Sequence, residues 1–160
     1  KLSSGVDLAL PPVPFVENLI TRNFSLGEVN FRFYSNTFWN LDNGFGESLS
    51  LDFDLSLNDS FLFRLSNDGT WLDNTDKINT SHGPTLFQQL SDRRFISYNF
   101  RANFVNRPTF VIRDYVASIV YRQKIIEDVV FYELTPEVLF PKSENFEAIG
   151  LISLKFELIF

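Results

Sequence analysis

Apolar residues recur at every second position through most of this chain. The clearest run covers residues 47–57, where Leu49, Leu51, Phe53, Leu55 and Leu57 alternate with Ser48, Ser50, Asp52, Asp54 and Ser56. A period of two places successive side chains on opposite faces of a β-strand. This run therefore predicts a strand with one apolar face and one polar face.

The same alternation predicts further strands before and after this run. We expect them at residues 5–10, 15–24, 29–40, 61–66, 96–104, 109–123, 129–140 and 150–160. A long loop at 72–83 and a turn at 91–93 leave room for one more strand between them. Pro136 interrupts its strand and predicts either a bulge or a weakened ladder, because proline has no N–H to donate. The total is about ten strands, with a range of about 8 to about 12.

The apolar faces have no partner layer in the sequence. A strand of a soluble protein can also alternate, with its acids in water, so one strand does not distinguish a soluble sheet from a transmembrane barrel. The repetition of apolar faces distinguishes them, because no segment has the helical period that would predict helices covering these faces. We therefore predict an all-β fold: a transmembrane, antiparallel, up-and-down β-barrel that forms a single domain over residues 1–160, with apolar faces toward lipid and polar faces inside.

Composition narrows the classes of protein further. The chain has 19 Phe, 5 Tyr and 2 Trp, yet its mean hydropathy is −0.03, and no apolar run approaches the length of about 18 residues that a spanning helix needs. The absence of cysteine excludes disulfides, thiol catalysis and zinc–thiolate sites. A net charge of −6 with no basic stripe argues against nucleic acid as a partner. We predict no cofactor.

The connections are asymmetric. If the chain ends on the periplasmic side, the connections at 25–28, 58–59, 91–93 and 124–128 lie there and are all short, while the longest, 72–83, lies outside. Short periplasmic turns and longer outer loops are typical of these barrels. The chain begins without a signal peptide or an initiator methionine, so we interpret it as a mature form or a C-terminal fragment.

The expected interior carries charges of both signs. They are Arg32, Arg64, Arg101, Arg122 and Lys155 together with Asp52, Asp54, Glu133, Glu137 and Glu157. In one interpretation they line a polar pore and set its ion selectivity. In the other they pair into a network that fills a narrow barrel. Both interpretations stay open at about ten strands.

Other polar residues suggest weaker hypotheses. His82, the only histidine, falls in the expected long loop near Asp73, Asp76 and Ser81, and a solvated loop histidine is favoured over a catalytic one because no nucleophile motif flanks it. The segments 42–44 and 73–76 offer oxygen donors for calcium, although turn chemistry explains them more simply and we predict no metal site. Trp39, Trp71 and Tyr98 are candidates for the aromatic belts at a membrane interface.

The C-terminal segment ends on alternating apolar residues: Ile152, Leu154, Phe156, Leu158 and Phe160. This ending resembles the C-terminal signal strand of Gram-negative outer-membrane barrels. The resemblance implies that Phe156, Leu158 and Phe160 are read by the barrel-assembly machinery.

A more specific resemblance rests on residues 38–39, 44–46, 68–71, 121–123, 127–133, 136, 140–141 and 154–160. These segments resemble the C-terminal barrel region of an uncharacterised family of proteobacterial outer-membrane proteins. The resemblance implies an integral protein of the cell outer membrane, in contact with lipid and lipopolysaccharide, and implies no activity. Members of that family extend further at the N-terminus, so a larger barrel completed by further segments is an alternative.

Three functions follow as expectations. The first is a small pore or channel for ions or small solutes. The second is a non-conducting barrel that anchors or partners another envelope protein. The third and least favoured is a lipid-modifying enzyme, a hydrolase or acyltransferase that uses His82 at the rim.

Overall fold

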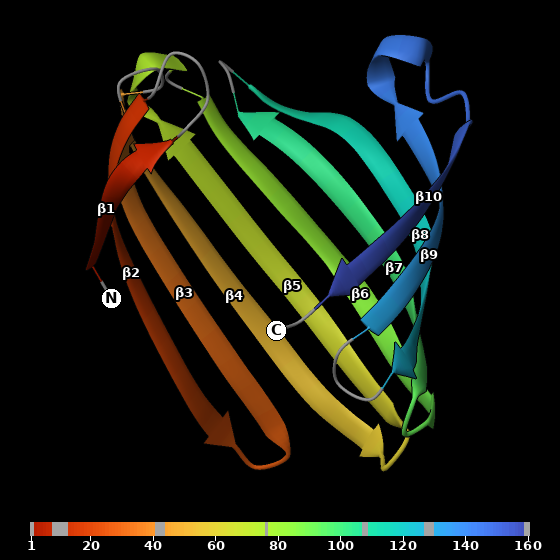
Figure 1. The fold of residues 1–160 in the computed structure, drawn as a ribbon. Helices are drawn as coiled ribbons and strands as arrows, with labels where there is room; N and C mark the ends of the chain where they lie inside the picture. Colours follow the sequence, from red (N-terminus) through yellow and green to blue (C-terminus); the bar gives the residue numbers. More distant parts are fainter. Residues whose placement is uncertain are drawn as a thin grey trace.

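The described part of the chain forms one antiparallel sheet. A computed structural model describes residues 2–7, 13–40, 44–75, 77–106, 109–126 and 130–158. Its ten strands lie side by side in sequence order (Figure 1). The elements are β1 (Leu2–Asp7), β2 (Val13–Leu26), β3 (Val29–Asn40), β4 (Gly44–Asn58), β5 (Phe61–Leu72), η1 (Asp73–Thr75), β6 (Lys77–Ser91), β7 (Arg94–Asn106), β8 (Phe110–Ile126), β9 (Val130–Pro141), η2 (Lys142–Glu144) and β10 (Ile149–Leu158).

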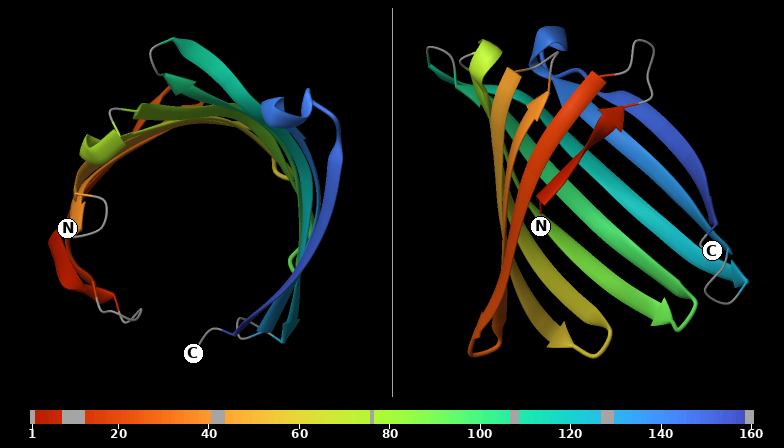
Figure 2. Two further views of the ribbon diagram at one scale, coloured as in Figure 1. Left: turned by 90° about the horizontal axis from the view of Figure 1, so that it is seen from above. Right: turned by 60° about the vertical axis from the view of Figure 1, so that its left-hand side comes forward.

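The sheet is strongly curved but not closed. Seen from above, the strands follow an arc whose two edges, β1 and β10, stay apart (Figure 2). The all-β, up-and-down, antiparallel prediction is confirmed.

Short turns join the strands at one end of the sheet, here called the turn end. Gly27 adopts a φ of 62° between β2 and β3, a conformation that costs glycine little. Between β4 and β5 the side-chain oxygen of Asn58 accepts hydrogen bonds from the backbone N–H groups of Ser60 (2.9 Å) and Phe61 (3.0 Å). Such self-capping by asparagine is why this residue favours turns. The opposite end, which carries η1 and η2, is called the loop end (Figure 1).

Two of the sequence-based boundaries are wrong. The long loop expected at 72–83 does not exist, because β6 begins at Lys77 and pairs with β5 along its length. Residues 77–83 are polar and do not alternate clearly, yet a neighbouring strand supplies hydrogen bonds to any sequence with the right backbone, so pairing overrides the local pattern. The first strand is Leu2–Asp7 rather than 5–10, and residues 8–10 lie outside the described part. By contrast, β3 has the predicted bounds.

The two faces of the sheet differ in chemistry, although Arg22 in β2 lies opposite Phe33 in the apolar row. Cross-strand partners place Phe31, Phe53 and Leu65 in one row, and this face, which also carries Leu49, is called the apolar face. The other face, which carries Asp52 and Asp54, is called the polar face. Every strand whose side chains are described contributes to both, as the alternation predicts.

Burial is inverted relative to a water-soluble domain. Among the side chains that the structure describes, no large hydrophobic one is buried, while Asp52, Asp54, Ser97 and Asp114 are. On the apolar face Ile152 is 79% exposed and Phe156 is 66% exposed. Side chains converge on the concave side of a single curved layer, so the shielded acids indicate that the polar face is the concave one. Soluble proteins bury the opposite set of residues.

The ladder is interrupted at two prolines. Between β8 and β9 the pairs Ser118–Glu137 and Tyr121–Leu134 keep one register on either side of Pro136. The expectation of a weakened ladder there is confirmed, and no bulge forms at that point. A similar gap lies between β6 and β7 at Gly83 and Pro84. These are the positions where one strand cannot donate a ladder hydrogen bond.

Candidate functional site on the polar face

All ten charged residues predicted to face the interior lie on the polar face. The cross-strand partners place them there strand by strand: Arg32 in β3, Asp52 and Asp54 in β4, Arg64 in β5, Arg101 in β7, Arg122 in β8, Glu133 and Glu137 in β9, and Lys155 and Glu157 in β10.

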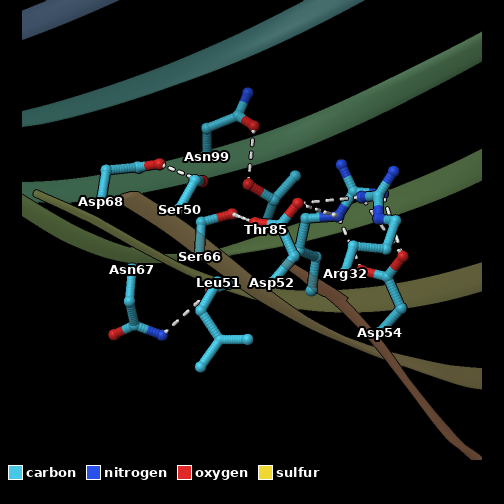
Figure 3. A network of polar contacts seen from close by, with 11 residues as sticks. Arg32, Ser50, Leu51, Asp52, Asp54, Ser66, Asn67, Asp68, Thr85 and Asn99 are labelled. Atoms are coloured by element: carbon cyan, nitrogen blue, oxygen red, sulfur yellow. Dashed lines mark hydrogen bonds and ion pairs between the residues drawn. The ribbon is translucent and has the colours of Figure 1, made fainter. Parts of the chain in front are cut away.

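The first group, the Arg–Asp cluster, joins Arg32, Asp52, Asp54 and Arg64 across three strands. Figure 3 labels Arg32 and the two aspartates. Arg32 Nη2 lies 3.1 Å from Asp52 Oδ2 and 3.3 Å from Asp54 Oδ2. Arg64 donates from Nε to Asp54 at 2.7 Å and from Nη2 at 3.1 Å. Two cations therefore balance two carboxylates in a shielded patch, where bidentate pairing is strongest.

Hydroxyl and amide groups extend this cluster across the sheet. Ser66 Oγ donates to Asp52 at 2.6 Å, and Ser50 Oγ donates to Asp68 at 2.5 Å. Further along, Thr85 Oγ1 donates to Asn99 Oδ1 at 3.0 Å (Figure 3). Sequence analysis identified the charged residues but not this neutral continuation, whose signal is the small polar residue at every second position.

The second group, the Arg–Glu cluster, joins Arg122, Glu133, Lys155 and Glu157 on β8, β9 and β10. Arg122 Nη2 lies 3.0 Å from Glu157 Oε2, and its Nη1 lies 3.9 Å from Glu133 Oε2. Lys155 Nζ lies 3.6 Å from Glu157. The side chain of Lys155 is 61% exposed, so this cluster is more open than the Arg–Asp cluster.

Two predicted residues join neither cluster. Within the described part of the chain, Arg101 and Glu137 make no ion pair and no side-chain hydrogen bond, and Arg101 is exposed. Sequence analysis also missed Asp114, which is buried, accepts a hydrogen bond from Asn103, and lies 2.6 Å from Arg113 Nε. The register of β7 and β8 shifts beside this pair, which indicates a β-bulge. In the sequence, the only signal of this site is that two charged residues are adjacent within an otherwise alternating segment.

The placement of His82 was predicted wrongly. His82 lies within β6 opposite Asn67, on the apolar face, and its Nδ1 is 2.9 Å from Asn67 Oδ1. Its ring packs near Phe104, with 5.8 Å between ring centroids. Ser81 points to the other face because neighbouring strand residues alternate. The arrangement of His82 with Ser81 that the enzyme hypothesis needs does not form, and Asp76 lies outside the described residues.

Aromatic side chains with polar atoms gather near both ends of the apolar face. At the loop end Trp71 packs against Phe45 with 6.0 Å between centroids, and Trp39 lies opposite Phe45. Toward the turn end, the hydroxyls of Tyr121 and Tyr132 both donate to Gln123 Oε1, at 2.7 Å and 3.1 Å. The hydroxyl of Tyr98, the third belt candidate, donates to Gln88 at 3.3 Å. Trp39, Trp71 and Tyr98 thus all lie on the apolar face.

The C-terminal residues are described in part. Phe156 lies on the apolar face of β10 opposite Tyr132, and the backbone of Leu158 pairs with Val130. Phe160 lies outside the described residues.

The two oxygen-rich segments considered for calcium are also described only in part. Asp73 and Asn74 are exposed in η1, while positions 42, 43 and 76 lie outside the described part.

The described segments hold no group of three or more His, Asp or Glu side chains that could bind a metal ion. They also contain no helix with the length and hydropathy needed to span a membrane. Neither a protein-family model nor a curated protein matches the sequence of the chain.

Proposed function

We propose that this protein is an integral outer-membrane β-barrel that forms a small pore for ions or small solutes. The observation that carries the proposal is the inverted distribution of side chains. Large apolar groups are exposed across the outer face of the sheet, while aspartates are shielded on the inner face. Such an arrangement is unfavourable in water and favourable in lipid, where the hydrocarbon chains cover the apolar face.

The aromatic residues support the orientation in a bilayer. Trp39 and Trp71 near one end, and Tyr121 and Tyr132 near the other, place an apolar ring beside a polar atom. Residues of this kind prefer the boundary between the hydrocarbon and the headgroups. The outer-membrane location and recognition by the barrel-assembly machinery rest on the resemblance of the C-terminal residues Phe156, Leu158 and Phe160, and lipopolysaccharide is then a partner of the outer leaflet.

The topology is compatible with closure. Strand direction alternates through ten strands, so β1 and β10 run antiparallel to each other (Figure 1). An unpaired strand edge in lipid leaves backbone polar groups without partners, which is costly. In the proposed state these two edges pair with each other or with further strands that complete the barrel.

A conducting interior is supported by one charged residue away from the open edges of the sheet. Arg101 in β7 is exposed, and it makes no ion pair within the described residues. A charge that remains solvated in this way lines a water-filled space and contributes to ion selection.

A non-conducting barrel that anchors an envelope partner is the second candidate. The Arg–Asp cluster favours it, since four charges that pair within 4.0 Å can fill part of a narrow interior. The third candidate, an enzyme that uses His82, is not supported, because His82 and Ser81 lie on opposite faces of β6.

The first test is the physical class of the protein. We expect it to be extracted from membranes only with detergent, and to show a β-type circular dichroism spectrum once folded. A monomer that stays soluble without detergent would contradict the barrel.

The second test separates the two barrel functions. Purified folded protein is added to planar lipid bilayers and single-channel conductance is recorded. Discrete conductance steps are expected of the pore. Folded protein that inserts and produces no steps would favour the anchor.

A further inference from the structure

A cavity of about 680 Å³ opens on the polar face at the turn end. Its walls come from the β4–β5 turn, the β6–β7 turn and the adjoining ends of β8 and β9. It lies beside the Arg–Asp cluster on one side and the Arg–Glu cluster on the other, sharing Arg64 with the first and Arg122 with the second. The cavity thus joins the two clusters described above.

The described lining of the cavity is rich in basic side chains. It holds Arg64, Arg93, Arg94, Arg122 and Lys124 against Asp59 and Asp92. The carboxylates that pair with Arg64 and Arg122, those of Asp54 and Glu157, lie just outside this lining. The cavity therefore offers an anion hydrogen-bond donors from charged groups rather than a net positive charge.

Aromatic rings lie in the wall beside two of these cations. The guanidinium carbon of Arg64 lies 4.8 Å from the centroid of Phe87, and that of Arg122 lies 4.6 Å from the centroid of Phe131. Stacking on a ring holds each guanidinium flat and leaves its N–H edge to bind acceptors. Both side chains keep solvent access, with 22% exposure for Arg64 and 24% for Arg122.

The two arginines have donors left after their ion pairs. Arg64 uses Nε and Nη2 for Asp54, which leaves Nη1 without a partner in the described part. Arg122 holds Glu157 through Nη2 at 3.0 Å, while its Nη1 is 3.9 Å from Glu133 and makes only a loose pair. Because guanidinium has five N–H donors, each arginine can donate hydrogen bonds to a further carboxylate.

We infer that this cavity binds a small organic anion with an apolar body, such as an aromatic carboxylate. Its volume is within the range of ligand pockets. The carboxylate binds Arg64 or Arg122, and the apolar part packs against Phe87 and Phe131. A neutral molecule forms no charge-assisted hydrogen bond of this kind with the arginines, and an inorganic anion gains nothing from the rings.

The inference goes beyond the proposed pore. It requires that the polar face be open to water, but it does not require that the protein conduct. In a conducting barrel the cavity is a binding site at the turn-end mouth for the anions that pass.

The test is a ligand-observed fluorine NMR titration. The folded protein in detergent micelles is titrated into para-trifluoromethylbenzoate, and the neutral para-trifluoromethylbenzyl alcohol serves as the control for partition into micelles. We expect saturable line broadening with the carboxylate, and with the alcohol only the non-saturable change that empty micelles produce. Wild-type protein without saturable carboxylate binding would overturn the site.

The two clusters offer matched controls for the arginines. Arg64→Gln and Arg32→Gln each remove one guanidinium from the Arg–Asp cluster, but only Arg64 lines the cavity. Arg122→Gln and Lys155→Gln are a similar pair in the Arg–Glu cluster. We expect the cavity variants to weaken binding about tenfold, because each removes a charge-assisted hydrogen bond, and the controls to change it less than about twofold.

Equal weakening in the cavity variants and their controls would overturn the site, since it would show a general effect of charge. Phe131→Leu keeps all charges and removes one ring, so it tests the site even if an arginine variant fails to fold. We expect it to weaken binding severalfold, and unchanged affinity would contradict the role of the ring. Binding without conductance would refute the pore alone, and conductance without binding would refute this site alone.

Discussion

Asp54 accepts two hydrogen bonds from Arg64 across the β4–β5 ladder, at 2.7 Å from Nε and 3.1 Å from Nη2. The two residues are direct cross-strand partners, and the side chain of Asp54 is only 11% exposed. A second guanidinium, from Arg32, lies 3.3 Å from the same carboxylate. The pair therefore links three strands at a point where little water can replace a lost partner.

Replacing Asp54 should reveal how much this link contributes. Asp54→Asn leaves Arg32 and Arg64 with one carboxylate between them, and we expect the free energy of unfolding to fall by about 2 kcal/mol, the size of hydrogen bonds to charged groups. Urea titration in detergent micelles measures it. Glu137→Gln is the matched control, since Glu137 lies on the same face and has no ion pair within the described residues. An equal loss in both variants would show that the polar face does not depend on this pair.

A second prediction concerns Gly83, which lies at the gap in the β6–β7 ladder. A Cβ atom at this position would overlap the carbonyl oxygen of Phe100 and lie 2.9 Å from the Cα of Arg101. Both are backbone atoms, so Gly83→Ala must push the strands apart, and we expect a clear loss of stability or of folded protein. Gly69→Ala is the control, because its Cβ would meet only a methyl carbon of Thr80 at 3.9 Å. Heat-modifiability on gels and urea titration compare the two, and similar behaviour would contradict the close approach at Gly83.

A third prediction uses two neighbouring residues that point to opposite faces. Phe100 lies on the apolar face and is 45% exposed, while Arg101 lies on the polar face. An arginine on a lipid face costs about 2–4 kcal/mol at the bilayer centre. Phe100→Arg should therefore impair folding severely, and Arg101→Phe should be tolerated better although it removes a charge. Yield of folded protein in the membrane fraction measures this, and equal tolerance would mean that the assignment of the faces is wrong.

The same face assignment predicts the effect of charge on a pore. Removing the positive charge of Arg101 should shift the preference toward cations, and removing the negative charge of Glu133 should shift it toward anions. Reversal potentials across a salt gradient measure both shifts. If the interior is filled, neither variant conducts, and Glu133→Gln loses stability because Arg122 loses a partner.

The last prediction concerns the terminal residue. The resemblance to C-terminal signal strands implies that Phe160 is read during assembly, so its deletion should lower the amount of folded protein in the outer membrane while synthesis stays unchanged. Pulse labelling with fractionation measures the two quantities separately. Normal assembly without Phe160 would show that the ending acts as an ordinary strand.

The sequence alone determined which residues share a face. Alternation is a property of the extended backbone itself, since each residue turns the next side chain by half a turn. It therefore placed Asp52, Asp54 and Arg64 on one side and Phe53 on the other before any partner was known, and it predicted the bounds of β3. The turn near Asn58 was also visible, because asparagine caps its own backbone.

Tertiary structure decided which residues meet. Residues 77–83 have a polar, irregular pattern, and only the hydrogen bonds offered by β5 made them part of β6 and moved His82 from an expected loop to the apolar face. In the same way, Arg32 reaches both Asp52 and Asp54 because of the β3–β4 register, which depends on the pairing of whole strands. The tertiary structure also decided that the sheet has open edges at β1 and β10 (Figure 2). The curvature of a sheet is the sum of all its strand pairings, so no single segment of the sequence predicts it.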